Sequence, residues 1–258
     1  MGKFSGILLA CDVDGTLVKD GILSDENAKA IEYFISEGGL FTVATGRTPE
    51  HIKEHYMPKL LVNAPMLCIN GTAIADEKSF EILWEKKMPN VFGKMIEEVR
   101  SVTQPEKIIL YKFSDTILVE NEIPEGEFYK ILFVTTTTEE ALSLKEKLGA
   151  LFPECHFSRS WHTGLEATCV NAGKGIALKK LKEITKAKLA IGMGNFENDL
   201  TLLESADYAA SVSDASDDVK AISDFITEND AENGVAEFIY KLEEKLQTKE
   251  KGSCILSI

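Results

Sequence analysis

An unbroken apolar run that ends at a pair of aspartates limits most strongly how this chain folds. The run is ILLAC, residues 7–11, and Asp12 and Asp14 follow it. It has the length of a strand and does not alternate apolar with polar positions, which is typical of a parallel strand buried on both faces. In an open α/β sheet, ligands bind beyond the carboxyl ends of the strands. We therefore expect the two carboxylates at a ligand-binding edge.

Strand-like and helix-like segments alternate at both ends of the chain. In the first 80 residues we expect helices that begin after Ser24 and at Pro49, and strands over 40–45 and 65–69. After Val170 we expect helices over 174–184, 199–205, 215–222 and 234–246, and strands over 188–194, 208–212 and 225–227. This alternation predicts an α/β fold with a doubly wound, Rossmann-like parallel sheet.

The middle of the chain follows a different pattern. We expect strands over 81–88, 107–113, 116–121 and 128–135, two more within 155–170, and helices over 90–102 and 138–148. Grouped strands with fewer helices predict an α+β module on an antiparallel sheet. We interpret residues 81–166 as an inserted domain and residues 1–80 and 167–258 as one core domain.

Charge and composition exclude several classes of partner. The chain has 28 Lys and Arg against 42 Asp and Glu, a net charge of −14, and nucleic-acid binding needs a basic face. No run approaches the ~18 apolar residues of a membrane-spanning helix. The segment before Cys11 is too short for a signal peptide, and an odd count of five cysteines favours reduced thiols. We expect a cytoplasmic protein, monomeric or a small homo-oligomer, that binds neither nucleic acid nor membrane.

The aspartate pair itself indicates a chemistry. A carboxylate at the end of a buried strand is costly unless a cation or hydrogen bonds meet it. One such Asp is explained by the capping of a turn, but Asp12 and Asp14 together fit a functional site better. Mg²⁺ suits the site because it binds one or two carboxylates and keeps waters for a substrate phosphate. Asp12 would then attack phosphorus, and Asp14 would act as general acid and base.

Four motifs follow one another along nearly the whole chain. They are DVDGTL at 12–17, ATGR at 44–47, GKG at 173–175 and GNFENDL at 194–200. With these motifs in this order, the chain resembles the haloacid dehalogenase (HAD) superfamily, in particular its Cof-type phosphatases with a large, C2-type inserted cap. The resemblance implies a HAD-like hydrolase core and a cap that determines substrate specificity.

The resemblance also implies roles for single residues. Asp12 would be the nucleophile and Asp14 the general acid/base. The transferring phosphoryl group would be held by Thr45, Gly46 and Lys174, and the Mg²⁺ ion by Asp12, Asp14, Asn195 and Asp199. Arg47, Asn70, Gly71 and Asn198 are further candidates for substrate contact. From the residues alone, Arg47 is more simply explained as a surface or ion-pair residue, and Asn70-Gly71 as a turn.

One residue departs from the family pattern. Asn195 stands where the family usually has an Asp that binds the metal directly. The amide keeps an oxygen ligand but removes a negative charge, so we expect weakened metal binding, by ~10–100-fold or more.

We therefore predict a Mg²⁺-dependent phosphatase of small phosphorylated metabolites, with sugar phosphates as the first class. The alternatives are a phosphomutase of the same superfamily and a catalytically weak sugar-phosphate-binding or regulatory protein. His51 and His55 are expected as a surface pair, and Trp161 and His162 mainly as packing residues.

Overall fold

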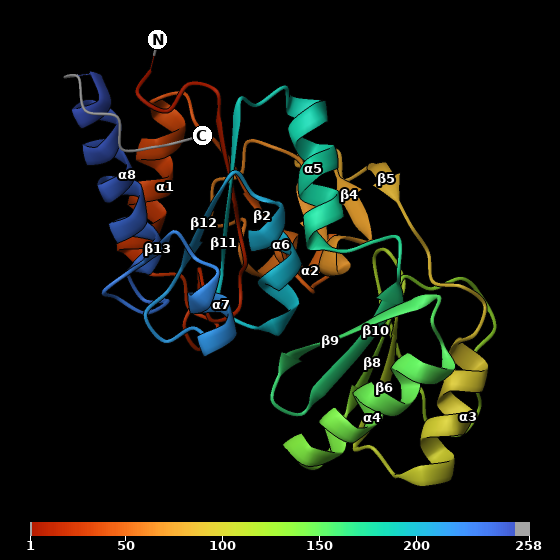
Figure 1. Cartoon of the computed structure of the whole chain (residues 1–258). Coiled ribbons are helices and arrows are strands. Elements are labelled where there is room, and N and C mark those ends of the chain that lie inside the picture. Colours follow the sequence, from red (N-terminus) through yellow and green to blue (C-terminus); the bar gives the residue numbers. More distant parts are fainter. Residues whose placement is uncertain (1, 251–258) are drawn as a thin grey trace.

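The computed structural model describes residues 2–250 and has two lobes, which Figure 1 shows side by side. Each lobe has its own hydrophobic core. The core of the larger lobe is built from residues near both ends of the chain, and that of the smaller lobe from residues between Met88 and Ala167. The smaller lobe is a cap inserted into the larger one, as predicted. The boundaries expected at 80/81 and 166/167 stay a prediction.

The larger lobe is organised around a five-stranded sheet in the order β13-β12-β11-β1-β2. All its neighbouring strands are parallel. The strands are β1 (Ile7–Cys11), β2 (Leu40–Val43), β11 (Leu189–Gly194), β12 (Tyr208–Ser211) and β13 (Phe225–Ile226). Every residue of β1 is buried, as expected for a strand inside a parallel sheet covered on both faces.

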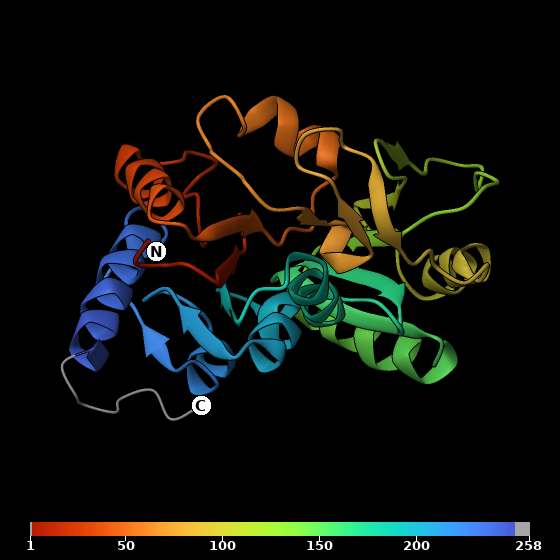
Figure 2. The ribbon, with the colours of Figure 1, turned by 90° about the horizontal axis from the view of Figure 1, so that it is seen from above.

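Helices cover both faces of this sheet, which confirms the doubly wound fold. Figures 1 and 2 show α1 and α8 together on one face and α5 and α6 on the other. The helices of this lobe are α1 (Asp25–Ser36), α2 (Pro49–His55), α5 (Lys174–Thr185), α6 (Leu200–Ser205), α7 (Asp217–Ala221) and α8 (Gly234–Glu250). Local capping fixes two of the starts: the Ser24 hydroxyl caps α1, and Thr48 caps α2 with Pro49 in its first turn.

A second, three-stranded sheet was only partly expected. It consists of β3 (Met66–Cys68), β4 (Ala73–Ala75) and β5 (Ile82–Glu85), all antiparallel. The third strand was expected in the parallel sheet, but its parallel pairing is limited to a single bridge between Leu67 of β3 and Ala44, the residue after β2. A short 3₁₀ helix (Ile69–Gly71) turns the chain back from β3 into β4, a strand that the sequence did not reveal.

The cap is an antiparallel sheet in the order β7-β6-β8-β10-β9, with two helices packed on one face. Its strands are β6 (Lys107–Tyr111), β7 (Thr116–Leu118), β8 (Lys130–Val134), β9 (Cys155–Trp161) and β10 (Gly164–Cys169), and its helices are α3 (Phe92–Val102) and α4 (Thr138–Leu151). Alternate residues such as Ile131 and Leu165 join the apolar core under the helices. Their neighbours Lys130 and Glu166 therefore lie on the opposite face of the sheet.

Two further sequence expectations concern thiols and membranes. Cys11, Cys68 and Cys155 are buried and unpaired, whereas Cys254 lies outside the described residues. Within residues 2–250, none of the helices combines the length and the apolar character that a membrane crossing needs.

Candidate active site

A buried lysine links two carboxylates at the carboxyl edge of the parallel sheet. Asp12 follows β1 and Lys174 is the first residue of α5. The Lys174 Nζ donates to Asp12 Oδ1 and to Asp199 Oδ1, both at 2.6 Å. All three side chains are almost fully excluded from solvent. This ionic triad brings together residues from three of the four motifs.

Burial dominates the electrostatics of the triad. It raises the pKa of the Asp12 carboxyl, the Asp199 charge adds to this rise, and the Lys174 ammonium opposes it. Burial also lowers the pKa of Lys174, but the two carboxylates more than offset this, so that its pKa is raised. The charged lysine is therefore retained inside the protein because two anions surround it.

Two glycines place the start of α5 against the 3₁₀ helix after β3. A β-carbon on Gly71 would lie 2.4 Å from the carbonyl carbon and oxygen of Gly173, so only glycine permits this approach. Gly71 also has a φ of +73°, in the left-handed region that favours glycine. Gly71 thus positions the N-terminus of α5 and with it Lys174.

The second aspartate of the pair is held by an arginine. Arg47 donates to both carboxylate oxygens of Asp14, from Nε at 2.7 Å and from Nη2 at 2.6 Å. Arg47 also contacts His51, whose pKa is lowered by burial and by the arginine charge. The backbone N–H of Arg47 donates to the Thr45 hydroxyl, which is fully buried. The ATGR loop therefore holds the Asp14 side chain in a bidentate ion pair.

Asn195 lies directly against the aspartate loop. A β-carbon on Gly15 would lie 2.3 Å from Asn195 Nδ2, so the amide packs onto the turn that follows Asp14. Asp199 is more deeply placed, and its Oδ2 accepts the backbone N–H groups of Asn195 and Phe196. Because Lys174 binds the other oxygen, these contacts favour an orienting role for Asp199.

The donor set at this edge fits a hard divalent cation. Asp12, Asp14 and Asn195 offer oxygen ligands and all line one cavity. The buried triad of Asp12, Asp199 and Lys174 carries a formal charge of −1, and Asp14 is neutralised by Arg47. No group of three or more His, Cys, Asp or Glu side chains with metal-binding geometry occurs among the described residues. The oxygen chemistry therefore suits Mg²⁺, with less negative charge than a third carboxylate would supply.

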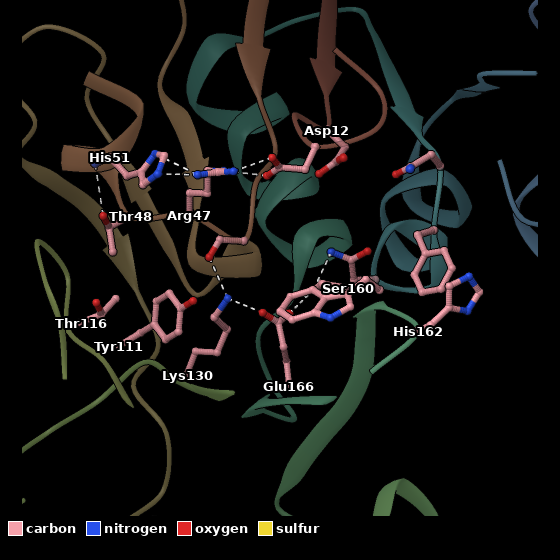
Figure 3. Close-up of a pocket in the computed structure, with 16 residues that line it drawn as sticks. Asp12, Arg47, Thr48, His51, Tyr111, Thr116, Lys130, Ser160, His162 and Glu166 are labelled. Carbon is pink, nitrogen blue, oxygen red and sulfur yellow. Dashed lines mark hydrogen bonds and ion pairs between the residues drawn. The ribbon is translucent and has the colours of Figure 1, made fainter. Parts of the chain in front are cut away.

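A cavity of about 670 Å³ opens between the lobes over these residues. Figure 3 shows Asp12 and Arg47 on one side of it and Lys130 and Glu166 on the other. Its wall consists of Asp12, Asp14, Gly46, Arg47, Thr48, His51, Tyr111, Thr116, Lys130, Ser160, Trp161, His162, Glu166, Asn195, Phe196 and Asn198. Thr45, Asn70, Gly71, Lys174 and Asp199 are buried and are not part of this wall.

The cap side of the cavity carries a buried ion pair. Lys130 Nζ lies 2.5 Å from Glu166 Oε1, and both side chains are nearly inaccessible to solvent. Lys130 also donates to the carbonyl oxygen of Gly46 at 2.7 Å and lies 3.9 Å from the centre of the Tyr111 ring. Glu166 accepts from the Asn70 amide and the Ser160 hydroxyl. The pair thus joins the cap to two core loops.

A second polar contact joins the cap to the GNFENDL loop. Glu197 accepts from Lys145 Nζ at 2.5 Å and from Arg159 Nε at 2.9 Å. Nearby, the Asn198 amide lies 3.2 Å from the Ser160 hydroxyl. The ATGR loop and the GNFENDL loop are therefore both in contact with the cap.

The sequence motifs located the core side of the site but not the cap side. Lys130, Glu166 and Ser160 were missed, and Trp161 and His162 line the cavity although packing was the favoured interpretation. The signal for the ion pair was present, since Lys130 and Glu166 are each the only charged residue of their strand.

Comparisons with known proteins agree with this geometry. A family model described as haloacid dehalogenase-like hydrolase matches residues 9–122 and 93–239. The 5-amino-6-(5-phospho-D-ribitylamino)uracil phosphatase YcsE of Bacillus subtilis (strain 168) is 27% identical over 239 residues, which are 90% of this chain and 94% of that protein. The pyridoxal phosphate phosphatase YbhA of Escherichia coli (strain K12) is 22% identical over 270 residues, 90% of this chain and 97% of that protein.

A solved structure shares the fold over almost the whole chain. It is a putative HAD/COF-like hydrolase from Plasmodium vivax, with a TM-score of 0.82 and 20% identity. The superposition covers 95% of this chain and 97% of that one, so the core and the inserted cap are shared together.

Proposed function

The chain belongs to the haloacid dehalogenase-like hydrolases and is a phosphoric monoester hydrolase of that family, and we propose that it is a Mg²⁺-dependent phosphatase of small phosphorylated metabolites. The two named relatives act on a ribitylaminouracil phosphate and on pyridoxal phosphate. Sugar phosphates are the first substrates to test, because hydroxyl and amide groups line the cavity.

The observation that carries the proposal is the triad at the cavity floor. Asp12 lines the cavity, and the Lys174 ammonium lies 2.6 Å from its carboxylate and from that of Asp199, so that the triad retains one negative charge. In the proposed first step, a carboxylate oxygen of Asp12 attacks phosphorus, and the bond from phosphorus to the leaving oxygen breaks. This step forms an aspartyl-phosphate. Lys174 holds its positive charge where the negative charge of the phosphoryl group gathers.

Asp14 serves as the proposed acid and base. In its protonated form it gives the proton to the leaving oxygen, and as carboxylate it then takes a proton from the attacking water. Water attack on phosphorus releases inorganic phosphate and restores the Asp12 carboxylate. In the structure Asp14 is paired with Arg47, so the acid role requires its side chain to turn from the guanidinium toward the leaving oxygen. That turn would free Arg47 to bind a phosphoryl oxygen.

The metal would be held by Asp12, the backbone carbonyl of Asp14 and the amide oxygen of Asn195, while Asp199 orients the loop. When bound, Mg²⁺ neutralises charge on the transferring group. Every ligand is an oxygen, as this cation prefers, and Asn195 contributes no charge. Weakened metal affinity is therefore part of the proposal.

Asn195 also supports a second candidate function, a sugar-phosphate binder with little catalysis. The two candidates separate in one experiment, hydrolysis of p-nitrophenyl phosphate across a Mg²⁺ titration, with Asp12→Asn as the matched control. The enzyme hypothesis expects Mg²⁺-dependent release of phosphate, without an acceptor sugar, that is lost in the variant. Thermal stabilisation by glucose 6-phosphate without turnover, in the parent chain and in Asn195→Asp alike, would favour the binder.

A further inference from the structure

We propose that the Lys130–Glu166 pair makes the cap end of the cavity selective for phosphate esters whose leaving group is uncharged. The inference rests on the proposed phosphatase function and deepens it, because it assigns the charge class of the substrate. It concerns the end of the cavity opposite Asp12, where the leaving group would lie (Figure 3).

The pairing of neighbouring cap strands places both charges on the wall. Lys130 begins β8 and Glu166 lies within β10, and both occur on the sheet face opposite the cap helices. Their side chains meet at 2.5 Å, with exposed fractions of 1% and 3%. An ion pair so far removed from water is screened little by solvent. Its charges therefore act directly on any group that enters the cavity.

The charges of the wall cancel in pairs. Among the described residues that line the cavity, the lysine and arginine side chains are Lys130 and Arg47, and each contacts a carboxylate within 2.6 Å. The Lys130 ammonium is further engaged by the Gly46 carbonyl and the Tyr111 ring. In the proposed mechanism, Arg47 is taken up by the transferring phosphoryl group once Asp14 releases it. A carboxylate or second phosphate on the leaving group would thus enter without a free cation to meet it.

An uncharged leaving group meets suitable partners at the same place. The Ser160 hydroxyl and the Asn198 amide lie beside Glu166 and offer hydrogen bonds to hydroxyl or amide groups. Trp161 lines the cavity with 41% of its surface exposed and offers an apolar face. Desolvating an unpaired carboxylate costs far more than desolvating a hydroxyl that finds a partner. The wall therefore discriminates by charge rather than by size.

Two aryl phosphates of equal size test this directly. These are 4-carbamoylphenyl phosphate and 4-carboxyphenyl phosphate, which differ mainly in one negative charge. The measured quantity is the ratio of their kcat/KM values at pH 8 with saturating Mg²⁺. This pH lies above the usual titration range of histidine, so that the histidines of the cavity carry no charge that could bind a carboxylate. For the parent chain we expect a ratio of about ten or more in favour of the carbamoyl ester.

Two substitutions must move this ratio in opposite directions. Glu166→Gln frees the Lys130 charge and lowers the ratio about tenfold, whereas Lys130→Gln exposes the Glu166 charge and raises it. Intrinsic differences between the two esters cancel, because each variant is compared with the parent chain. The matched control is Glu98→Gln, which breaks a cap ion pair with Lys147 away from the cavity and should leave the ratio unchanged.

The outcomes separate the inference from the function on which it rests. Charge selection alone is overturned if both esters are hydrolysed and their kcat/KM ratio in the parent chain is near one. It is also overturned if the ratio is the same in both variants as in the parent chain. If one variant fails to fold, the other and the parent ratio still decide. Hydrolysis of neither ester, nor of p-nitrophenyl phosphate, contradicts the phosphatase function itself.

Discussion

The ammonium of Lys174 lies 2.6 Å from the carboxylate of Asp12, a residue 162 positions away in the sequence. The same ammonium lies 2.6 Å from Asp199, and no part of its side chain is exposed to solvent. A buried charge with these partners cannot be removed without leaving two carboxylates uncompensated. The relationship therefore links the stability of the core to the proposed chemistry.

Replacement of this lysine should affect both properties. In Lys174→Met we expect the free energy of unfolding to fall by about 3 kcal/mol, because two buried carboxylates lose their counter-charge. We expect kcat to fall by about 10²–10³-fold, because the charge beside the transferring group is lost. Chemical denaturation and phosphate release measure the two effects. The control is Lys182→Met on the same helix, whose half-exposed pair with Asp207 should contribute less than about 1 kcal/mol. Equal effects of the two substitutions would contradict the account.

The missing charge at position 195 should be restorable. In Asn195→Asp we expect the Mg²⁺ concentration for half-maximal activity to fall by about 10–100-fold, because a carboxylate replaces a neutral ligand. A calorimetric Mg²⁺ titration should show the same gain in affinity without any substrate. In EDTA the variant should melt at a lower temperature than the parent chain, because the added charge then repels Asp12 and Asp199. An unchanged Mg²⁺ affinity would show that residue 195 is not a metal ligand.

Gly71, which packs against the backbone just before α5, should tolerate no side chain. In Gly71→Ala the new β-carbon would lie 2.4 Å from the Gly173 carbonyl, which displaces the helix that carries Lys174. Gly21→Ala is a matched control, since Gly21 has a similar φ of +77° but no atom within 4 Å of a β-carbon. Both variants bear a backbone cost of about 1 kcal/mol, and we expect a further loss of about 2 kcal/mol in Gly71→Ala alone. Equal stabilities in denaturant unfolding would refute the packing role of Gly71.

Glu237, in the first turn of α8, makes a pH-dependent contribution to stability. Partial burial alone would raise the pKa of the Glu237 carboxyl. Hydrogen bonds from the backbone N–H groups of Glu228 and Asn229 and from the Asn229 side-chain amide outweigh this effect, so that the pKa lies below its usual 4.5. A carboxyl group whose pKa is lower in the folded state than in the unfolded state stabilises the fold at pH values above its unfolded pKa. This stabilisation is lost as the pH falls through the folded pKa. Because solvent screens this carboxylate, we expect Glu237→Gln to cost less than about 1 kcal/mol at pH 7 and progressively less below about pH 4.5. A cost independent of pH between 7 and 3 would argue against this origin.

Most of the fold follows from local patterns in the sequence. β1 begins and ends at the predicted residues, because a continuous apolar run between polar neighbours leaves little freedom. α1 begins where Ser24 predicts, because its hydroxyl caps the helix. The short run at 66–68 was assigned to the wrong sheet, because three apolar residues do not reveal whether the next strand pairs parallel or antiparallel.

The site was predictable where its residues follow strand ends and not where it depends on the cap. Asp12, Asp14 and Asn195 all follow core strands, so the sheet brings them to one edge. Lys130 and Glu166 reach the site only because the cap sheet turns one particular face toward the core, and that packing is a tertiary property. Asp199 was expected to bind or orient the metal, and the sequence did not reveal that its oxygens accept from Lys174 and from two backbone N–H groups of its own loop.

The covalent intermediate on Asp12 is the most direct test of the proposed mechanism. The protein is mixed with p-nitrophenyl phosphate and saturating Mg²⁺, quenched in acid within the first turnover and reduced with borohydride, and residue 12 is identified by peptide mass spectrometry. An aspartyl-phosphate is reduced to homoserine, so the account predicts homoserine at position 12, in an amount that follows the burst of p-nitrophenol. Phosphate release at the full rate with Asp12 unmodified, or undiminished turnover by Asp12→Asn, would contradict it.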